Sequence, residues 1–159
     1  MEEKYIESTC CYLIHEDEWL MLYRNKKKND VNAGKWIGVG GKREEGESNL
    51  QCAVREIREE TGISLDENDL RFCGTVYFLY DFKDAEKIAL YTGNVEDTSV
   101  IDCSEGELAW IEEKDILNLN LWEGDRIFLK KMLQKDFSPF TLFLHYNENG
   151  DLTDWKEGE

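Results

Sequence analysis

The sequence is short of basic residues and of long apolar runs. Its 159 residues include 19 Lys and Arg against 35 Asp and Glu, which gives a formal net charge of −16. Such an acidic surface repels phosphate polymers, so we expect no nucleic-acid polymer as a partner. No apolar run approaches the ~20 residues that span a bilayer, and the N-terminal segment has no signal-peptide pattern. We therefore expect a cytoplasmic protein without a membrane partner.

Cysteine pairs and proline are scarce as well. The five cysteines include no CxxC pair and no zinc-ligand spacing, which predicts small buried residues rather than a metal or redox motif. Pro139 is the sole proline, and no linker or repeat divides the chain. With 41% apolar and 34% charged residues, the composition is typical of a globular protein. We expect a single domain over residues 1–159.

The apolar patterns predict a chain in which strands outnumber helices. Residues 24–34 are polar and basic and predict an exposed loop, and the glycine-rich residues 36–41 predict a strand or a tight connection. This order predicts an α/β sandwich with a mixed sheet. Strands are expected at 8–14, 18–23, 71–80, 87–95, 108–111 and 141–146, and helices at 49–61 and 123–133.

The helix at 49–61 has the clearest boundaries. Ser48 is a good N-cap, and Gln51 three residues later completes a capping box. Gly62 stands where a left-handed C-terminal cap is expected.

Three glutamates of this helix lie within little more than one turn. Glu56 and Glu60 are four residues apart on one side, and Glu59 is adjacent. Like charges at this spacing destabilise a helix, whereas a divalent cation between them turns repulsion into binding. Arg55 is within reach to orient these carboxylates. A solvated acidic face is the alternative explanation for the cluster.

The wider pattern around the three glutamates resembles the signature of Nudix hydrolases. That signature is Gly, five residues, Glu, seven residues, then Arg-Glu-aliphatic-any-Glu-Glu-any-Gly-aliphatic. The resemblance implies a Nudix-type α/β/α sandwich and an enzyme that uses Mg²⁺, or Mn²⁺, to cleave a nucleoside diphosphate derivative. The matching residues are Gly41, Glu47, Arg55, Glu56, Ile57, Glu59, Glu60, Gly62 and Ile63.

The resemblance also implies a role for each matching residue. Glu47 would be the ion-pair partner of Arg55, and Glu105, outside the signature, matches an additional carboxylate of the oxidised-purine branch. The alternative for Glu105 is a solvated loop residue beside Glu107. The implied metal ligands are Glu56, Glu59, Glu60, Glu105 and the backbone carbonyl of Gly41, and the implied catalytic residues are Arg55, Glu59, Glu60 and Glu105.

Segments beyond the signature resemble the MutT-type 8-oxo-dGTP diphosphatases, especially their MutX-like branch. These segments are NKKKNDVNAGKWIGVGGKREEGE, IDCSEGELAW and LWEGDRIFL. The resemblance implies hydrolysis of a nucleoside triphosphate, with 8-oxo-dGTP or a related oxidised purine nucleotide as substrate, to the monophosphate and pyrophosphate. The implied substrate-binding residues are Trp122 and Asp125 for the base, Phe78 and Tyr80 for the pocket walls, and Lys42.

Two positions depart from the vertebrate members of that branch. Ile37 replaces an asparagine that contacts the base, and Gly124 replaces the first acid of an aspartate pair. A preference for the oxidised base therefore depends on Asp125.

Other substrates and another class of protein remain open. Tyr80 matches a tyrosine typical of diadenosine polyphosphate hydrolases, whereas residues 76–80 lack the proline typical of ADP-ribose pyrophosphatases. A non-catalytic nucleotide-binding module is the remaining class, but such proteins usually lose glutamates of the signature.

Overall fold

A mixed sheet of eight strands runs through the middle of the molecule. The computed structural model describes residues 5–158. The strands follow the order β3-β2-β1-β5-β4-β7-β8, with β6 paired to β2. The β1–β5 and β4–β7 pairs are parallel, and the other pairs are antiparallel. The strands are β1 (Ile6–His15), β2 (Glu18–Arg24), β3 (Trp36–Ile37), β4 (Leu70–Tyr80), β5 (Glu86–Asn94), β6 (Gly106–Glu112), β7 (Phe140–Tyr146) and β8 (Leu152–Gly158).

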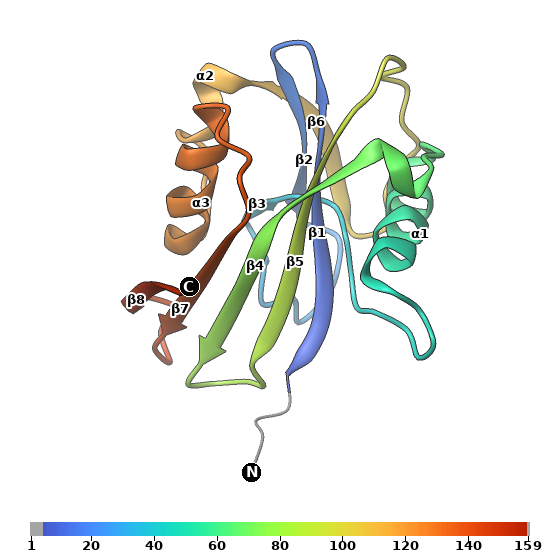
Figure 1. The fold of residues 1–159 in the computed structure, drawn as a ribbon. Coiled ribbons are helices and arrows are strands. Elements are labelled where there is room, and N and C mark those ends of the chain that lie inside the picture. The colour runs from blue at the N-terminus through green and yellow to red at the C-terminus, as the bar shows by residue number, and fades with distance from the viewer. Residues whose placement is uncertain (1–4, 159) are drawn as a thin grey trace.

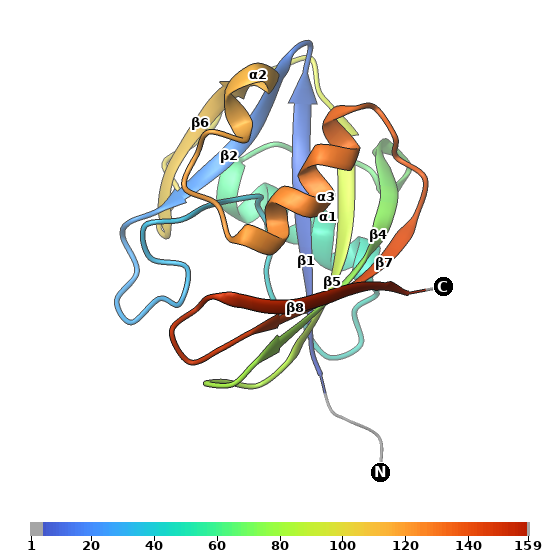
Figure 2. The same ribbon diagram turned by 90° about the vertical axis from the view of Figure 1, so that its left-hand side faces the viewer.

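Helices cover both faces of this sheet. The helix α1 (Asn49–Thr61) lies on one face, and α3 (Glu123–Leu133) lies on the other, with the short α2 (Glu113–Ile116) near the C-terminal end of α3 (Figure 1). The view turned by 90° shows α3 in front of the sheet and α1 behind it (Figure 2). The expected α/β/α sandwich with a mixed sheet is confirmed.

Each face of the sheet has its own apolar core. Side chains alternate along β1, so that Tyr12 packs in the core under α3 while Leu13 packs in the core under α1. Phe128 of α3 belongs to the first core, and Ile57 of α1 belongs to the second. Ile57 faces this core, and the carboxylate of its neighbour Glu56 lies against Gly41, in the connection that precedes the helix.

The helix α1 has the predicted limits. The Ser48 hydroxyl accepts the Gln51 N–H at 3.0 Å, and the Gln51 side chain accepts the Ser48 N–H at 2.8 Å. Gly62 adopts a left-handed φ of 82°, and its N–H donates to the carbonyl of Arg58. Both ends of the helix are therefore fixed by local bonds that the sequence specifies.

Three elements were not predicted from the sequence: a 3-10 turn η1 (Glu67–Asp69), α2 and β8. The prediction that residue 24 begins an exposed loop was also wrong, because Arg24 is buried at the end of β2. The cysteines are free, and all but Cys10 are buried. No helix among residues 5–158 is long and apolar enough to cross a membrane.

Candidate active site

A cleft of about 750 Å³ joins two groups of residues that are far apart in the sequence. Glu56 and Glu105 line one part of it, and Trp122 and Asp125 line another. Phe78, Tyr80 and Lys42 also line the cleft. The structure thus brings residues from β4, α1, α3 and two loops to one cavity.

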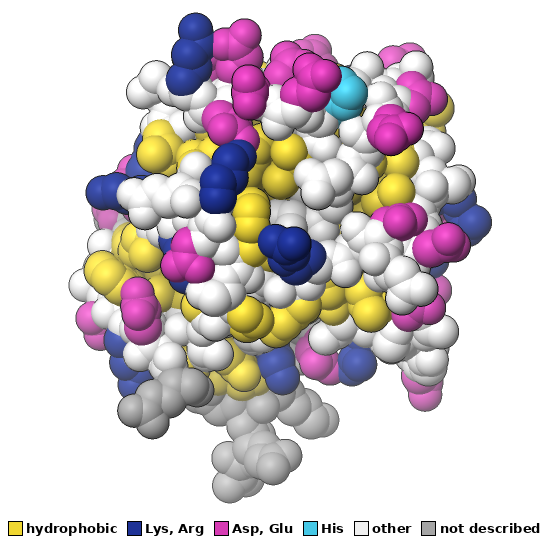
Figure 3. All heavy atoms as spheres, turned by 45° about the horizontal axis from the view of Figure 1, so that its top comes forward, with side chains coloured by type: hydrophobic (Ala, Val, Ile, Leu, Met, Phe, Trp, Pro, Cys, Tyr) yellow, Lys and Arg dark blue, Asp and Glu magenta, His cyan; other side chains and the backbone are white. Residues whose placement is uncertain are grey.

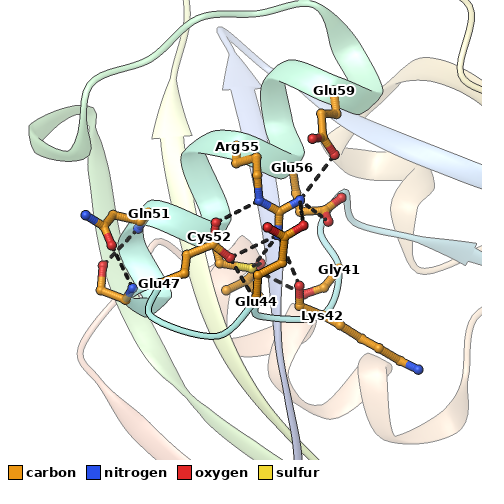
Figure 4. A network of polar contacts seen from close by, with 11 residues as sticks. Gly41, Lys42, Glu44, Glu47, Gln51, Cys52, Arg55, Glu56 and Glu59 are labelled. Atoms are coloured by element: carbon orange, nitrogen blue, oxygen red, sulfur yellow. Dashed lines mark hydrogen bonds and ion pairs between the residues drawn. The ribbon is translucent and has the colours of Figure 1, made fainter.

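Arg55 is at the centre of the carboxylate group (Figure 4). Its Nε and Nη2 donate to the two carboxylate oxygens of Glu47 at 2.7 and 3.0 Å, which forms a bidentate pair. Its Nη1 donates to Glu56 at 2.9 Å and to Glu59 at 3.2 Å. The hydrogen bond from Arg55 is the main cause that lowers the pKa of Glu47 to about 2. One guanidinium therefore orients three glutamates.

A glycine pair before α1 lets the backbone approach these glutamates closely. The Gly40 N–H donates to Glu60 Oε2 at 2.9 Å. A Cβ at Gly41 would lie 2.6 Å from the Glu56 carboxylate, so a side chain there would displace Glu56. The Gly41 carbonyl accepts the Thr9 N–H at 2.9 Å. In the structure, Gly41 therefore serves mainly to leave space for the Glu56 carboxylate.

The buried glutamates repel one another. Burial, and then a hydrogen bond with Glu105, raises the pKa of Glu60 well above its usual range, although the Gly40 N–H opposes this. Burial also raises the pKa of Glu56, where Glu59 and Glu105 add to the effect and Arg55 opposes it. Carboxylate oxygens gathered in this way are the ligands that a hard divalent cation takes, and its charge would relieve their repulsion. The donor set therefore fits such an ion.

Not all of the implied metal ligands converge. Glu59 is 56% exposed, is bonded to Arg55, and does not line the cleft, whereas Glu56 and Glu105 do. Glu105 lies 3.4 Å from Arg24 Nη1 and 3.9 Å from Lys27 Nζ. Within residues 5–158, no three Asp, Glu, His or Cys side chains already have the arrangement of a metal site. Basic partners hold Glu56, Glu59 and Glu105, so binding of an ion would require side-chain rotations.

Aromatic side chains form a wall of the other part of the cleft. The rings of Phe78 and Tyr80 are stacked with centroids 5.9 Å apart, and Tyr80 stacks on Tyr146 at 5.9 Å. Trp122 meets Tyr146 edge-on at 5.1 Å. Phe78 belongs both to the core under α3 and to the lining of the cleft.

Asp125 is the polar group inside this aromatic part. It is only 5% exposed, and its Oδ1 has no hydrogen-bond partner. Burial raises the pKa of Asp125 to about 7, and the charge of Lys35 opposes this shift. A buried carboxyl oxygen without a partner is costly, so it points to a ligand that supplies one.

The structure explains why position 124 holds no second acid. A Cβ at Gly124 would lie 2.3 Å from Leu144 and 2.6 Å from the Tyr146 hydroxyl, which itself accepts the Gly124 N–H. Asp125 is thus the sole carboxyl at the start of α3 that faces the cleft.

Sequence reasoning missed several residues that line or support the cleft. Arg24 bonds to Asp30 Oδ2 at 2.8 Å, and Asn32 accepts the Trp122 indole N–H at 2.7 Å. Lys35 lies 5.2 Å from the centroid of the Trp122 ring. Arg24, Asp30 and Asn32 belong to residues 24–34, which were predicted to be an exposed loop, and Lys35 follows that segment directly. The acidic and amide residues among its lysines were a hint that part of the segment is not simply exposed.

Comparison with known proteins decides the family. Residues 4–132 match the model of the NUDIX domain, which covers most of the chain. The chain belongs to the Nudix family. It is therefore a hydrolase that acts on diphosphate bonds of nucleotides, and Nudix hydrolases generally need a divalent metal ion.

Two relatives and one solved structure show what this Nudix hydrolase is similar to. It is 32% identical over 137 residues to the uncharacterized Nudix hydrolase YvcI of Bacillus subtilis, covering 79% of this chain and 78% of that protein. It is 29% identical over 110 residues to an oxidized purine nucleoside triphosphate hydrolase of Danio rerio, covering 69% of each. The crystal structure of a MutT protein from Bacillus halodurans has the same fold, with a TM-score of 0.83, 24% identity, and coverage of 96% of this chain and 97% of that one.

Proposed function

We propose that the protein hydrolyses a purine nucleoside triphosphate, with 8-oxo-dGTP as the candidate substrate, to the monophosphate and pyrophosphate. The observation that carries this proposal is the continuous cleft between the carboxylates of α1 and the unpartnered Asp125. Its volume of about 750 Å³ is in the usual range for a nucleotide-sized ligand. The similarity to an oxidized purine nucleoside triphosphate hydrolase supports the same substrate class.

The aromatic part would bind the base. Trp122, Phe78 and Tyr80 supply flat apolar surface for a purine ring. Asp125 offers Oδ1 to the polar edge of that ring, and its carboxyl group can donate or accept according to its protonation. Ile37 adds an apolar wall.

Basic side chains along the cleft would bind the phosphates. Lys27, Lys42, Arg43 and Lys83 line it. Arg24 lines it too, but it is buried and paired with Asp30 and Glu105, so it is not counted among the phosphate-binding residues. Phosphate oxygens are good acceptors for such groups. Five basic and six acidic side chains line the cleft, compared with 19 and 35 in the whole chain, so a polyanionic ligand meets less negative charge here than on the rest of the surface.

The carboxylates would hold Mg²⁺, or Mn²⁺, beside the phosphates. Glu56, Glu60 and Glu105 are the residues whose oxygens gather at the cleft end of α1. When bound, the cation supplies charge neutralisation for the diphosphate and activates water for attack on phosphorus. We assign to Glu105 the removal of a proton from that water, because it lines the cleft and is partly exposed. Arg55 positions Glu47, Glu56 and Glu59 through its bonds to them.

A substrate panel tests the proposal. The values of kcat/KM are compared for 8-oxo-dGTP, dGTP, dATP, dCTP, diadenosine tetraphosphate and ADP-ribose, with pyrophosphate and orthophosphate measured as products. We expect the highest value for 8-oxo-dGTP, release of pyrophosphate, and loss of turnover in EDTA. A higher kcat/KM for diadenosine tetraphosphate would instead indicate a diadenosine polyphosphate hydrolase, in which Tyr80 contacts that substrate. Absence of turnover on the whole panel would favour a nucleotide-binding module without catalytic activity.

A further inference from the structure

Arg24 holds two carboxylates that belong to different parts of the cleft. Its Nε donates to Asp30 Oδ2 at 2.8 Å, and its Nη1 lies 3.4 Å from Glu105 Oε2. Its side chain is 9% exposed and that of Asp30 is 5% exposed. Removal of one partner from a buried ion pair is strongly destabilising, so the buried Asp30 depends on this guanidinium. Glu105 is 30% exposed and pairs with Arg24 and Lys27.

The contacts continue from Asp30 to the indole of Trp122. Asp30 Oδ1 accepts the Asn32 N–H at 3.1 Å, and Asn32 Oδ1 accepts the Trp122 indole N–H at 2.7 Å. A chain of hydrogen bonds and ion pairs thus connects Glu105 to Trp122 through Arg24, Asp30 and Asn32.

The loop of residues 25–34 has no helix or strand to hold it, and Arg24 closes it. The Arg24 carbonyl accepts the Gly34 N–H at 2.9 Å, and the Arg24 N–H donates to the Lys35 carbonyl at 3.0 Å. At the other side, Lys26 Nζ donates to the Cys103 carbonyl at 3.2 Å. The loop therefore lies between the segment that carries Glu105 and the segment that carries Trp122.

We propose that Arg24 is a positioning residue that couples the base-binding indole to the carboxylate at the reacting phosphate. It acts through Asp30 and Asn32 on Trp122, and directly on Glu105. The sugar limits the distance between the base and the phosphates of a nucleotide to a narrow range, so holding both ends of the cleft on one guanidinium presets the cleft to that range. This inference rests on the proposed function, which gives Trp122 and Glu105 their roles.

Lysine at position 24 would not replace arginine. The guanidinium is a planar fork whose Nε and Nη1 reach two acceptors in fixed directions, whereas an ammonium group is a single point charge. Arg24→Lys therefore keeps the charge but cannot hold Asp30 and Glu105 in their present geometry. Asn32→Ala breaks the same chain at its other end without touching Glu105.

The test uses two readouts that need no metal. The affinity for 8-oxo-dGMP is measured by calorimetry in EDTA, and the indole ¹H–¹⁵N resonance of Trp122 is followed by NMR after assignment with Trp122→Phe. We expect Arg24→Lys to shift this resonance and to weaken binding about three- to tenfold, although Arg24 does not contact Trp122. Asn32→Ala should do the same, and the double variant should lose no more affinity than the weaker-binding single variant.

The matched control is Lys28→Ala, which changes an exposed lysine of the same loop that does not line the cleft. It should alter neither readout. If Arg24→Lys does not fold, Asp30→Asn takes its place, because it keeps the shape and removes the charge that pairs with Arg24.

Two results would overturn the coupling: an unchanged Trp122 resonance and affinity in Arg24→Lys, or additive losses in the double variant. Failure of the proposed function gives a different result. In that case wild type does not bind 8-oxo-dGMP, while the shift of the resonance in Arg24→Lys still reports on the coupling.

Discussion

At the scale of single residues, the site contains glutamates whose charge is costly in the fold. Glu60 is 7% exposed, lies beside Glu105, and has a raised pKa caused mainly by burial. A buried acid whose ionisation the fold disfavours contributes little to stability, and this makes Glu60 a candidate for binding or catalysis. The spacing of the glutamates could be predicted from the sequence, because a helix places residues four apart on one side.

Glu60→Gln is expected to lower kcat by about 100-fold or more, because stabilisation of charge through a metal is worth several kcal/mol. The free energy of unfolding should stay the same or rise, since a neutral amide of the same shape replaces a buried carboxyl group whose ionisation the fold disfavours. Steady-state kinetics and urea denaturation measure the two effects. The control is Glu67→Gln, an exposed change in η1. If Glu60→Gln keeps the kcat of wild type, Glu60 has no role in catalysis.

Glu105→Gln is expected to depress kcat while most nucleotide affinity remains, because Glu105 lines the cleft but lies away from the aromatic wall. The kinetic constants and the affinity for 8-oxo-dGMP in EDTA separate the two effects. The control is Glu107→Gln, two residues away and exposed. A kcat within threefold of wild type would mean that Glu105 has no catalytic role and is only a solvated glutamate paired with Arg24.

Asp125 gives a prediction about pH. Its pKa rises from 3.8 in the reference state to about 7 in the fold, so the folded protein favours the protonated form. The stability that this provides is fully present below pH 3.8 and is lost as pH rises to about 7. Relative to Asp125→Asn, wild type should therefore lose stability between pH 5 and 7, by at most about 1.4 kcal/mol per pH unit. Urea unfolding at several pH values measures this difference.

The exposed Asp154→Asn in β8 is the control for that pH series. The difference in the free energy of unfolding between Asp154→Asn and wild type should stay constant between pH 5 and 7. A constant difference between wild type and Asp125→Asn from pH 5 to 8 would mean that Asp125 is ionised in the fold throughout.

At the scale of elements, α1 sets the position of the signature glutamates through its capped start. Ser48→Ala removes the hydroxyl that accepts the Gln51 N–H, and it should lower the free energy of unfolding by about 1 kcal/mol. Because Glu56 lies about two turns further on, kcat should change little. Urea denaturation compares this variant with Ser64→Ala, an exposed serine outside the helix. Equal stability of the two variants would contradict a role of the cap.

The elements that could be predicted from the sequence are those with local causes. The helix α1 has its cap residues within its own segment, and β1 has a clear alternation of apolar side chains. The strand β8 has neither, because most of its side chains are exposed and it is held by backbone pairing with β7. Arg24, Asp30 and Asn32 could not be placed for the same reason: loop closure brings them to Glu105 and Trp122. Contacts between distant segments leave no local pattern.

At the scale of the whole molecule, negative charge is spread widely over the surface. Figure 3 shows one face on which acidic side chains gather along the upper edge and are scattered around the rest of the rim, while basic side chains lie in the middle and at the sides. The net charge of −16 is therefore a property of the surface at large, whereas the lining of the cleft is close to balanced, with five basic and six acidic side chains. Repulsion among like charges across a surface opposes the compact state.

This distribution predicts how stability depends on salt. Between 10 and 150 mM NaCl the Debye length falls from about 30 to about 8 Å, which screens repulsion between distant acidic groups. Buried pairs such as Arg24 with Asp30 are screened much less. The free energy of unfolding, measured with urea because it is uncharged, should therefore rise over this range. Sucrose at the same osmolarity controls for effects of solute exclusion. A fall in stability would mean that exposed ion pairs outweigh the net repulsion of the acidic surface.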